Sequence, residues 1–179
     1  MKALCTMSLL FALAACSHLE TRSPAGVDLS GTWELDARRS DLPPPLGRRS
    51  RSEVDDNGES RGDGAPRFSG PMPLLPMVTA TSMTIAQDPT SMGVDYPNQP
   101  YRDVKWGKQK RGLYVVDAGW DDKRRLIILT TSKPLDVRET YSIDPSGNTL
   151  TLQIDLNGER MEGRHITRVF NRSATGHAP

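Results

Sequence analysis

Histidine, a frequent acid–base catalyst, is scarce in this chain. Of the three histidines, His18 and His177 lie near the two ends, so His165 is the only imidazole in the segment that is expected to fold. Its serine partner would be Ser142 or Ser146, and neither lies in a Gly-x-Ser-x-Gly elbow. A single imidazole cannot hold a transition metal alone. We therefore expect His165 at the rim or surface of the domain, with no catalytic residue, metal or cofactor.

Glu139 is the strongest carboxylate candidate for acid–base chemistry. It shares the expected inward face of its strand with Tyr141 and two apolar residues. A carboxylate inside a core is costly unless it is paired, and a raised pKa would let it act as an acid or a base. The alternative is an ion pair with Arg138 or Arg168, or an outward-facing side of the strand. We favour this structural role over a hydrolase or isomerase.

The densest charge cluster is basic. Seven basic residues between positions 105 and 125 accompany three acids, Asp117, Asp121 and Asp122. The basic residues are Lys105, Lys108, Lys110, Arg111, Lys123, Arg124 and Arg125. If the two hairpin ends meet, these residues form a patch for lipid head groups or lipopolysaccharide phosphates. The alternative is that the charges only keep turns and strand edges soluble.

The N-terminus has the organisation of a secretory signal. Lys2 supplies positive charge, and residues 3–15 form an apolar run that is too short to span a bilayer. The run ends in Leu13-Ala14-Ala15-Cys16, which resembles the lipobox of bacterial lipoproteins. The alternative is an ordinary signal peptide that is cut after Ala15.

The lipobox resemblance implies cleavage before Cys16, diacylglycerol on its thiol, and an acyl chain such as palmitate on its new amino group. Two or three acyl chains make release from a membrane very slow. Ser17 follows the cysteine, and by the same resemblance a residue other than Asp there favours the outer membrane of a Gram-negative bacterium. The globular domain would then lie in the periplasm. No free thiol, disulfide or cysteine metal site would remain, because Cys5 leaves with the signal peptide.

Composition limits the classes of protein that this chain can belong to. Its 179 residues contain 23 basic and 22 acidic side chains, a balance that argues against a nucleic-acid binder. Hydrophobic residues make up 36% and aromatic residues 6% of the chain, which is enough for one modest core. We expect one domain, formed by residues 28–36 and 79–172, with residues 16–27 as a tether and 173–179 as a tail.

Residues 37–78 interrupt this domain. Seven of the 14 prolines lie there, among many Gly, Ser, Arg and Asp residues. Such a segment buries too little apolar surface to offset its ordering entropy. We expect a long disordered insertion after the first strand.

The rest of the chain has the pattern of antiparallel strands. Turn signals recur every eight to twelve residues, and Leu150, Leu152, Ile154 and Leu156 alternate with polar neighbours. Asn157-Gly158 is a typical hairpin turn. The pattern predicts an all-β, antiparallel up-and-down barrel of eight or nine strands.

Two features of this layout resemble the lipocalin-like (calycin) barrels. Gly31-Thr32-Trp33 matches the Gly-x-Trp of their first strand, and Arg168 or Arg172 matches the basic residue that packs across this tryptophan and closes the barrel. We assign this closing role to Trp33 and Arg168. The chain ends also resemble a family of small secreted bacterial proteins of uncharacterised function. The resemblance implies a fold more than an activity.

We therefore expect a non-enzymatic, lipid-anchored periplasmic barrel that binds a small apolar or amphipathic ligand in its mouth. The candidate lining consists of four aromatic residues, Trp106, Tyr114, Trp120 and Tyr141. The alternative is an envelope interaction protein, which docks onto a protein partner or an anionic surface through its basic patch and Pro-rich insertion. In that case the barrel interior is filled by side chains.

Overall fold

The computed structural model describes residues 18–43, 75–133, 135–158 and 163–173. The predicted signal peptide, Cys16, most of the predicted insertion and the tail from residue 174 lie outside the described residues. The described part forms ten strands and one short helix: β1 Gly31–Leu35, α1 Pro76–Thr79, β2 Ser82–Gln87, β3 Ser91–Asp95, β4 Arg102–Lys105, β5 Gly107–Arg111, β6 Tyr114–Trp120, β7 Leu126–Thr131, β8 Leu135–Ile143, β9 Thr149–Gly158 and β10 Arg164–Arg172.

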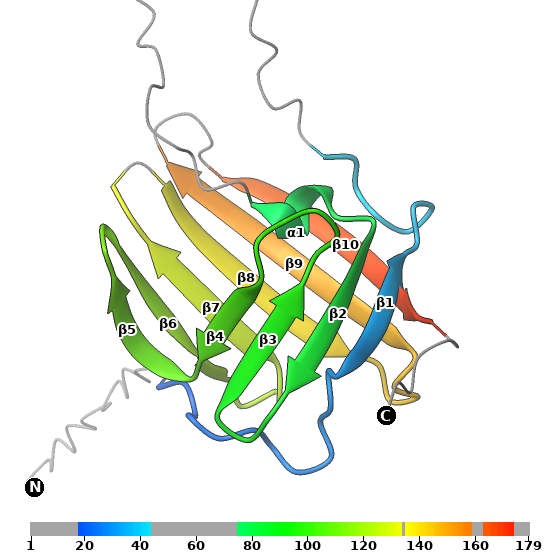
Figure 1. The fold of residues 1–179 in the computed structure, drawn as a ribbon, viewed down its shortest axis with the longest axis horizontal. Coiled ribbons are helices and arrows are strands. Elements are labelled where there is room, and N and C mark those ends of the chain that lie inside the picture. The colour runs from blue at the N-terminus through cyan, green and yellow to red at the C-terminus, as the bar shows by residue number, and fades with distance from the viewer. Residues whose placement is uncertain (1–17, 44–74, 134, 159–162, 174–179) are drawn as a thin grey trace, which may run out of the picture.

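The ten strands form one antiparallel sheet in the order β4-β3-β2-β1-β10-β9-β8-β7-β6-β5 (Figure 1). The first and last strands pair, with Trp33 opposite Arg172, and this pairing curls the sheet into a barrel. β4 and β5 are the two edge strands and do not pair with each other, so a seam remains between them. Trp106 separates the two strands in the sequence. The fold is an all-β, antiparallel, nearly closed barrel, which confirms the predicted class.

The predicted count of eight or nine strands is wrong, because the sequence pattern does not reveal β5. Gly107 and Gly112 flank four polar residues, a pattern that is typical of a turn, whereas Gly107–Arg111 pairs with β6. Its sequence, Gly-Lys-Gln-Lys-Arg, contains no apolar residue and therefore no hydrophobic alternation. An edge strand tolerates this composition because it pairs on one side only.

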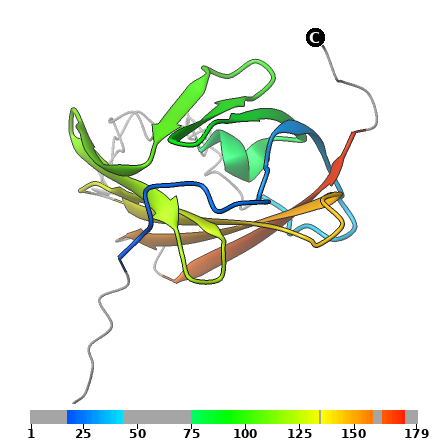
Figure 2. The ribbon, with the colours of Figure 1, turned by 90° about the horizontal axis from the view of Figure 1, so that it is seen from below.

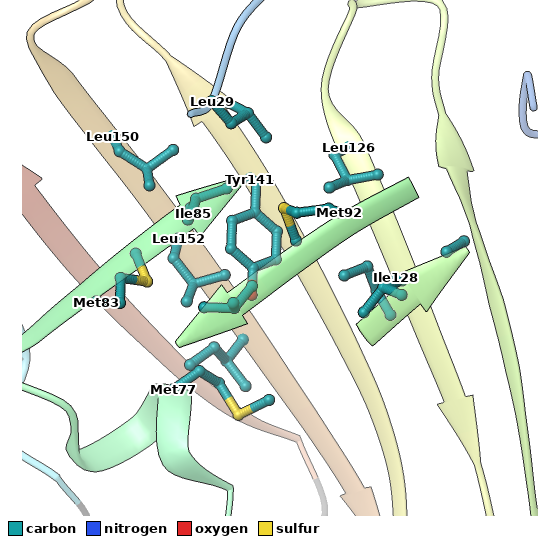
Figure 3. Close-up of a cluster of buried hydrophobic side chains, with 14 of the residues drawn as sticks. Leu29, Met77, Met83, Ile85, Met92, Leu126, Ile128, Tyr141, Leu150 and Leu152 are labelled. Atoms are coloured by element: carbon teal, nitrogen blue, oxygen red, sulfur yellow. The ribbon is translucent and has the colours of Figure 1, made fainter. Parts of the chain in front are cut away.

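The core lies between the two halves of the barrel. Alternation in the sequence places every second residue of each strand inward, as in β9, where Leu150, Leu152, Ile154 and Leu156 are buried. Figure 3 shows how side chains from opposite walls meet: Met83, Ile85 and Met92 from β2 and β3, and Leu126, Ile128, Tyr141, Leu150 and Leu152 from β7, β8 and β9. Side chains thus fill this part of the barrel.

Different segments cover the two ends of the barrel. The short helix α1 lies at one end and buries Met77 and Val78 in the core (Figure 1). Residues 19–29, here named the strap, cross the other end of the barrel. The Glu20 backbone pairs with that of Trp120 at 2.8 and 2.9 Å, and the Gln87 side chain holds the backbone of Val27 and Leu29. The part of the predicted tether that the structure describes is therefore packed against the barrel.

Some of the predicted insertion also packs on the barrel. Residues 37–41 run beside β10, where the backbone N–H of Asp41 donates to the Thr167 carbonyl at 2.8 Å. The Asp41 carboxylate accepts a hydrogen bond from the Thr167 N–H at 2.7 Å. None of the described helices is long and apolar enough to cross a membrane.

Candidate functional site

Four polar side chains meet in the barrel interior and are here named the interior cluster: Tyr96, Arg102, Glu139 and Tyr141. The Arg102 guanidinium donates two hydrogen bonds to the Glu139 carboxylate, at 2.7 Å from Nη1 and 2.6 Å from Nη2. The Tyr141 hydroxyl donates to the same carboxylate at 2.8 Å. The Glu139 side chain is fully buried, whereas the Arg102 side chain is 20% exposed to solvent.

Burial controls the protonation of this cluster. It opposes the charge of Arg102, but the adjacent Glu139 carboxylate holds the pKa of Arg102 well above its ordinary value. Burial raises the pKa of Tyr96 to about 12 and also raises that of Tyr141. The Tyr96 hydroxyl is buried and has no hydrogen-bond partner among the described residues. The cluster is thus an arginine–carboxylate pair with two neutral phenols beside it.

Glu139 points into the barrel, as one of the sequence interpretations has it. Its ion-pair partner is neither Arg138 nor Arg168, the two arginines that we expected. Arg102 pairs with it, whereas Arg138 is exposed on the outer face. Arg168 donates instead to the carbonyls of Asp41 and Ala80, at 3.1 and 2.7 Å. Three donors occupy the Glu139 carboxylate, which is the geometry of a structural ion pair.

The four aromatic residues that we expected to line a ligand site differ in their burial. Trp106 and Trp120 pack edge to face, with ring centroids 5.9 Å apart, and both are buried in the core with Tyr141. Tyr114 is 41% exposed, at the start of β6. Three of the four are therefore core residues, and the fourth faces solvent.

Arg172, rather than Arg168, closes the barrel over Trp33. The Arg172 guanidinium carbon lies 4.3 Å from the centroid of the indole ring. The Trp33 Nε1–H donates to the Leu29 carbonyl at 2.9 Å, which joins the strap to this stack. The two arginines are four residues apart on one strand, so sequence spacing alone did not distinguish them.

A pocket of about 570 Å³, here named the end pocket, lies at the strap end of the barrel. Figure 2 views this end. Four segments line the pocket: residues 26–28 of the strap, the β6–β7 turn at 123–125, residues 142–147, and Arg172. Val27 and Ile143 pack against the core and give the pocket apolar wall. Its volume is in the range of small-molecule sites.

The rim of the end pocket is charged. Lys123, Arg124, Arg125 and Arg172 supply positive charge, and Asp28 and Asp144 supply negative charge. Hydrogen bonds from the Ser146 hydroxyl and from neighbouring backbone amides lower the pKa of Asp144. Apolar wall and polar rim together suit an amphipathic molecule.

The seven residues of the predicted basic patch occupy two parts of the structure. Lys123, Arg124 and Arg125 lie on the turn beside the end pocket. The other four lie on the edge strands next to the seam, where Lys108 and Lys110 are exposed and Arg111 contacts Asp103 at 3.9 Å. Contact of these residues with lipid head groups or lipopolysaccharide phosphates stays a prediction.

His165 lies on the surface, as predicted. It pairs with Asp155 across β9 and β10 at 2.6 Å, and both side chains are about half exposed. Among the described residues, no group of three His, Cys, Asp or Glu side chains is placed to hold a metal ion.

Fold and pocket together define a class: a nearly closed antiparallel β-barrel with an amphipathic pocket at one end.

No protein-family model matches the chain, and no curated protein is significantly similar to it in sequence. Two solved structures are similar. One is an abundant heat-soluble (SAHS) protein from Ramazzottius varieornatus, with 12% identity and a TM-score of 0.39, over 51% of this chain and 70% of that one. The other is the N57A mutant of the fluorescent protein UnaG, with 12% identity and a TM-score of 0.44, over 82% and 97%. At this similarity neither assigns the chain to a family.

Proposed function

We propose that this chain is a lipid-anchored β-barrel protein of the bacterial outer membrane, with its domain in the periplasm, and that it binds a small amphipathic ligand in the end pocket without catalysing a reaction. The observation that carries the proposal is the end pocket itself, which combines apolar wall from Val27 and Ile143 with a charged rim. The proposed site lies at one end of the barrel, and its lining contains none of the four aromatic residues that we expected there.

The position of the strap supports a link between the pocket and the membrane anchor. Glu20 is hydrogen-bonded at the strap end of the barrel, only four residues after Cys16. Four extended residues span at most about 14 Å. If Cys16 carries acyl chains, this end of the barrel, with its pocket, lies close to the membrane surface.

Native mass spectrometry of the processed protein, purified gently from its own envelope, tests the proposal. We expect one bound small molecule per chain. Ser142→Trp places a large ring in the pocket and should abolish this adduct, whereas Thr131→Trp, on the exposed end of β7, should retain it. A mass without ligand, or an adduct that survives Ser142→Trp, would contradict binding in the end pocket.

A further inference from the structure

The end pocket has four basic lining residues, Lys123, Arg124, Arg125 and Arg172, and two acidic ones, Asp28 and Asp144. Arg125 pairs with Asp121 at 2.6 Å, but Lys123, Arg124 and Arg172 have no carboxylate partner among the described residues. Both lining carboxylates accept hydrogen bonds from nearby turns. Asp28 binds the Ser30 N–H at 2.8 Å, and Asp144 binds three groups of its own turn. Positive charge therefore remains available to a ligand.

Arg124 connects the β6–β7 turn to the strap. Its φ is 61°, in the left-handed region that Gly or Asn adopts with less strain. The guanidinium reaches across to the strap and donates to the Ala25 carbonyl, beside Gly26. Such a φ is usual for the residue that follows a type I turn in a hairpin, and the Arg124 N–H donates to the Asp121 carbonyl across this turn at 3.0 Å.

Arg172 connects the pocket to the core. Its guanidinium donates to the Gly147 carbonyl at 2.7 Å and to the Ser30 carbonyl, and it lies over Trp33. Carbonyl oxygens orient the group without cancelling its charge. An anion at this edge of the pocket would change the electric field at the Trp33 indole, which provides a fluorescent reporter.

From these contacts we infer that the ligand of the end pocket is an anion of the phosphate class, held by Lys123, Arg124 and Arg172, with its apolar part on Val27 and Ile143. This inference rests on the proposed function and adds the chemistry of the head group. Guanidinium and ammonium groups are the usual partners of phosphate oxygens. The phosphate could belong to a lipid head group or to a free phosphate ion.

The test is titration of the purified full-length chain with octyl phosphate, octyltrimethylammonium and inorganic phosphate, followed by calorimetry and tryptophan fluorescence. We expect octyl phosphate to bind at least tenfold more tightly than the cation, and more weakly as salt increases. Lys123→Gln should weaken it about tenfold, since a hydrogen bond to a charged group is lost. Arg124→Gln should do the same, whereas Lys108→Gln, exposed on β5 and outside the pocket, should not.

The outcomes separate the two proposals. If the cation binds as tightly as octyl phosphate, the inference of an anion is wrong while the pocket remains a ligand site. If neither octyl compound binds, the proposed function fails. Competition by inorganic phosphate that Lys123→Gln abolishes would support the anion and identify free phosphate as its source. Binding that requires the octyl chain would support a lipid head group.

Discussion

Arg102 on the edge strand β4 and Glu139 on β8 meet across the barrel interior through two hydrogen bonds of 2.7 and 2.6 Å. β4 has a backbone partner strand on one side only, because it is the last strand of the sheet at the seam. The Arg102–Glu139 ion pair therefore stabilises the position of β4, which has backbone hydrogen bonds to one neighbouring strand only. It connects the seam to the opposite wall, where β8 pairs with both β7 and β9.

Removal of one partner should destabilise the barrel strongly. We expect Glu139→Gln to lower the free energy of unfolding by about 3–5 kcal/mol, because it leaves the Arg102 charge buried without a counterion. Urea denaturation followed by tryptophan fluorescence measures this loss. Glu34→Gln, on the exposed face of β1, should stay within about 0.5 kcal/mol of the wild type. The double variant Arg102→Met/Glu139→Met should recover much of the loss; equal stability of Glu139→Gln and wild type would refute the structural role.

Alkaline pH should unfold the barrel through its buried phenols. Burial raises the pKa of Tyr96 from 10.0 to about 12, so the stabilisation is complete below pH 10 and is lost as pH rises through 12. A shift of this size corresponds to roughly 2–3 kcal/mol. Tyr96→Phe should flatten the decline of the unfolding free energy between pH 10 and 12, while Tyr101→Phe, at a largely exposed ring, controls for the loss of a hydroxyl. An unchanged slope in Tyr96→Phe would show that this phenol is not the responsible group.

The strap should detach when a side chain is added at Gly119. A Cβ there would lie 2.7 Å from the Glu20 carbonyl oxygen and 2.8 Å from the Leu19 Cβ, closer than such atoms pack. We expect Gly119→Ala to speed trypsin cleavage after Arg22, because the strap must move away from β6. Leu113→Ala, at a fully exposed turn, should leave the cleavage rate unchanged. Equal cleavage of Gly119→Ala and wild type would mean that the strap does not rest on this glycine.

Cys16 should carry the membrane anchor. When the chain is expressed in a Gram-negative host with labelled palmitate, we expect label on the wild type and none on Cys16→Ala, which should leave the membrane fraction. Cys5→Ala is the matched control and should keep its label, since Cys5 belongs to the predicted signal peptide. Label on Cys16→Ala would overturn the lipobox assignment.

The sequence predicted the class of the fold because alternation is a local signal. Leu150, Leu152, Ile154 and Leu156 each occupy an inward position of β9, where the two-residue period places them. β5 was not predicted, because its Gly, Lys, Gln and Arg residues show no alternation of apolar and polar side chains. Trp33 was correctly expected at the barrel closure, but only the register with Arg172 distinguished its partner from Arg168.

The two candidate sites depend on contacts that no local pattern contains. Arg102 and Glu139 are 37 positions apart and meet only because the sheet curls. The end pocket combines residues 26–28, 123–125, 142–147 and Arg172, which the topology gathers at one end of the barrel. Lys123, Arg124 and Arg125 could be singled out as basic residues of one turn, whereas their apolar neighbours Val27 and Ile143 could not.

The location of the bound ligand is the most direct test of this account. Two-dimensional ¹H–¹⁵N NMR spectra of the full-length chain, recorded as octyl phosphate is added, report every backbone amide. We predict that the shifts concentrate at residues 26–28, 123–125 and 142–147 and at Arg172, with the indole signal of Trp33 moving as well. Shifts centred instead on Tyr96, Trp106, Trp120 and Tyr141 would place the ligand inside the barrel and contradict the end pocket as the binding site.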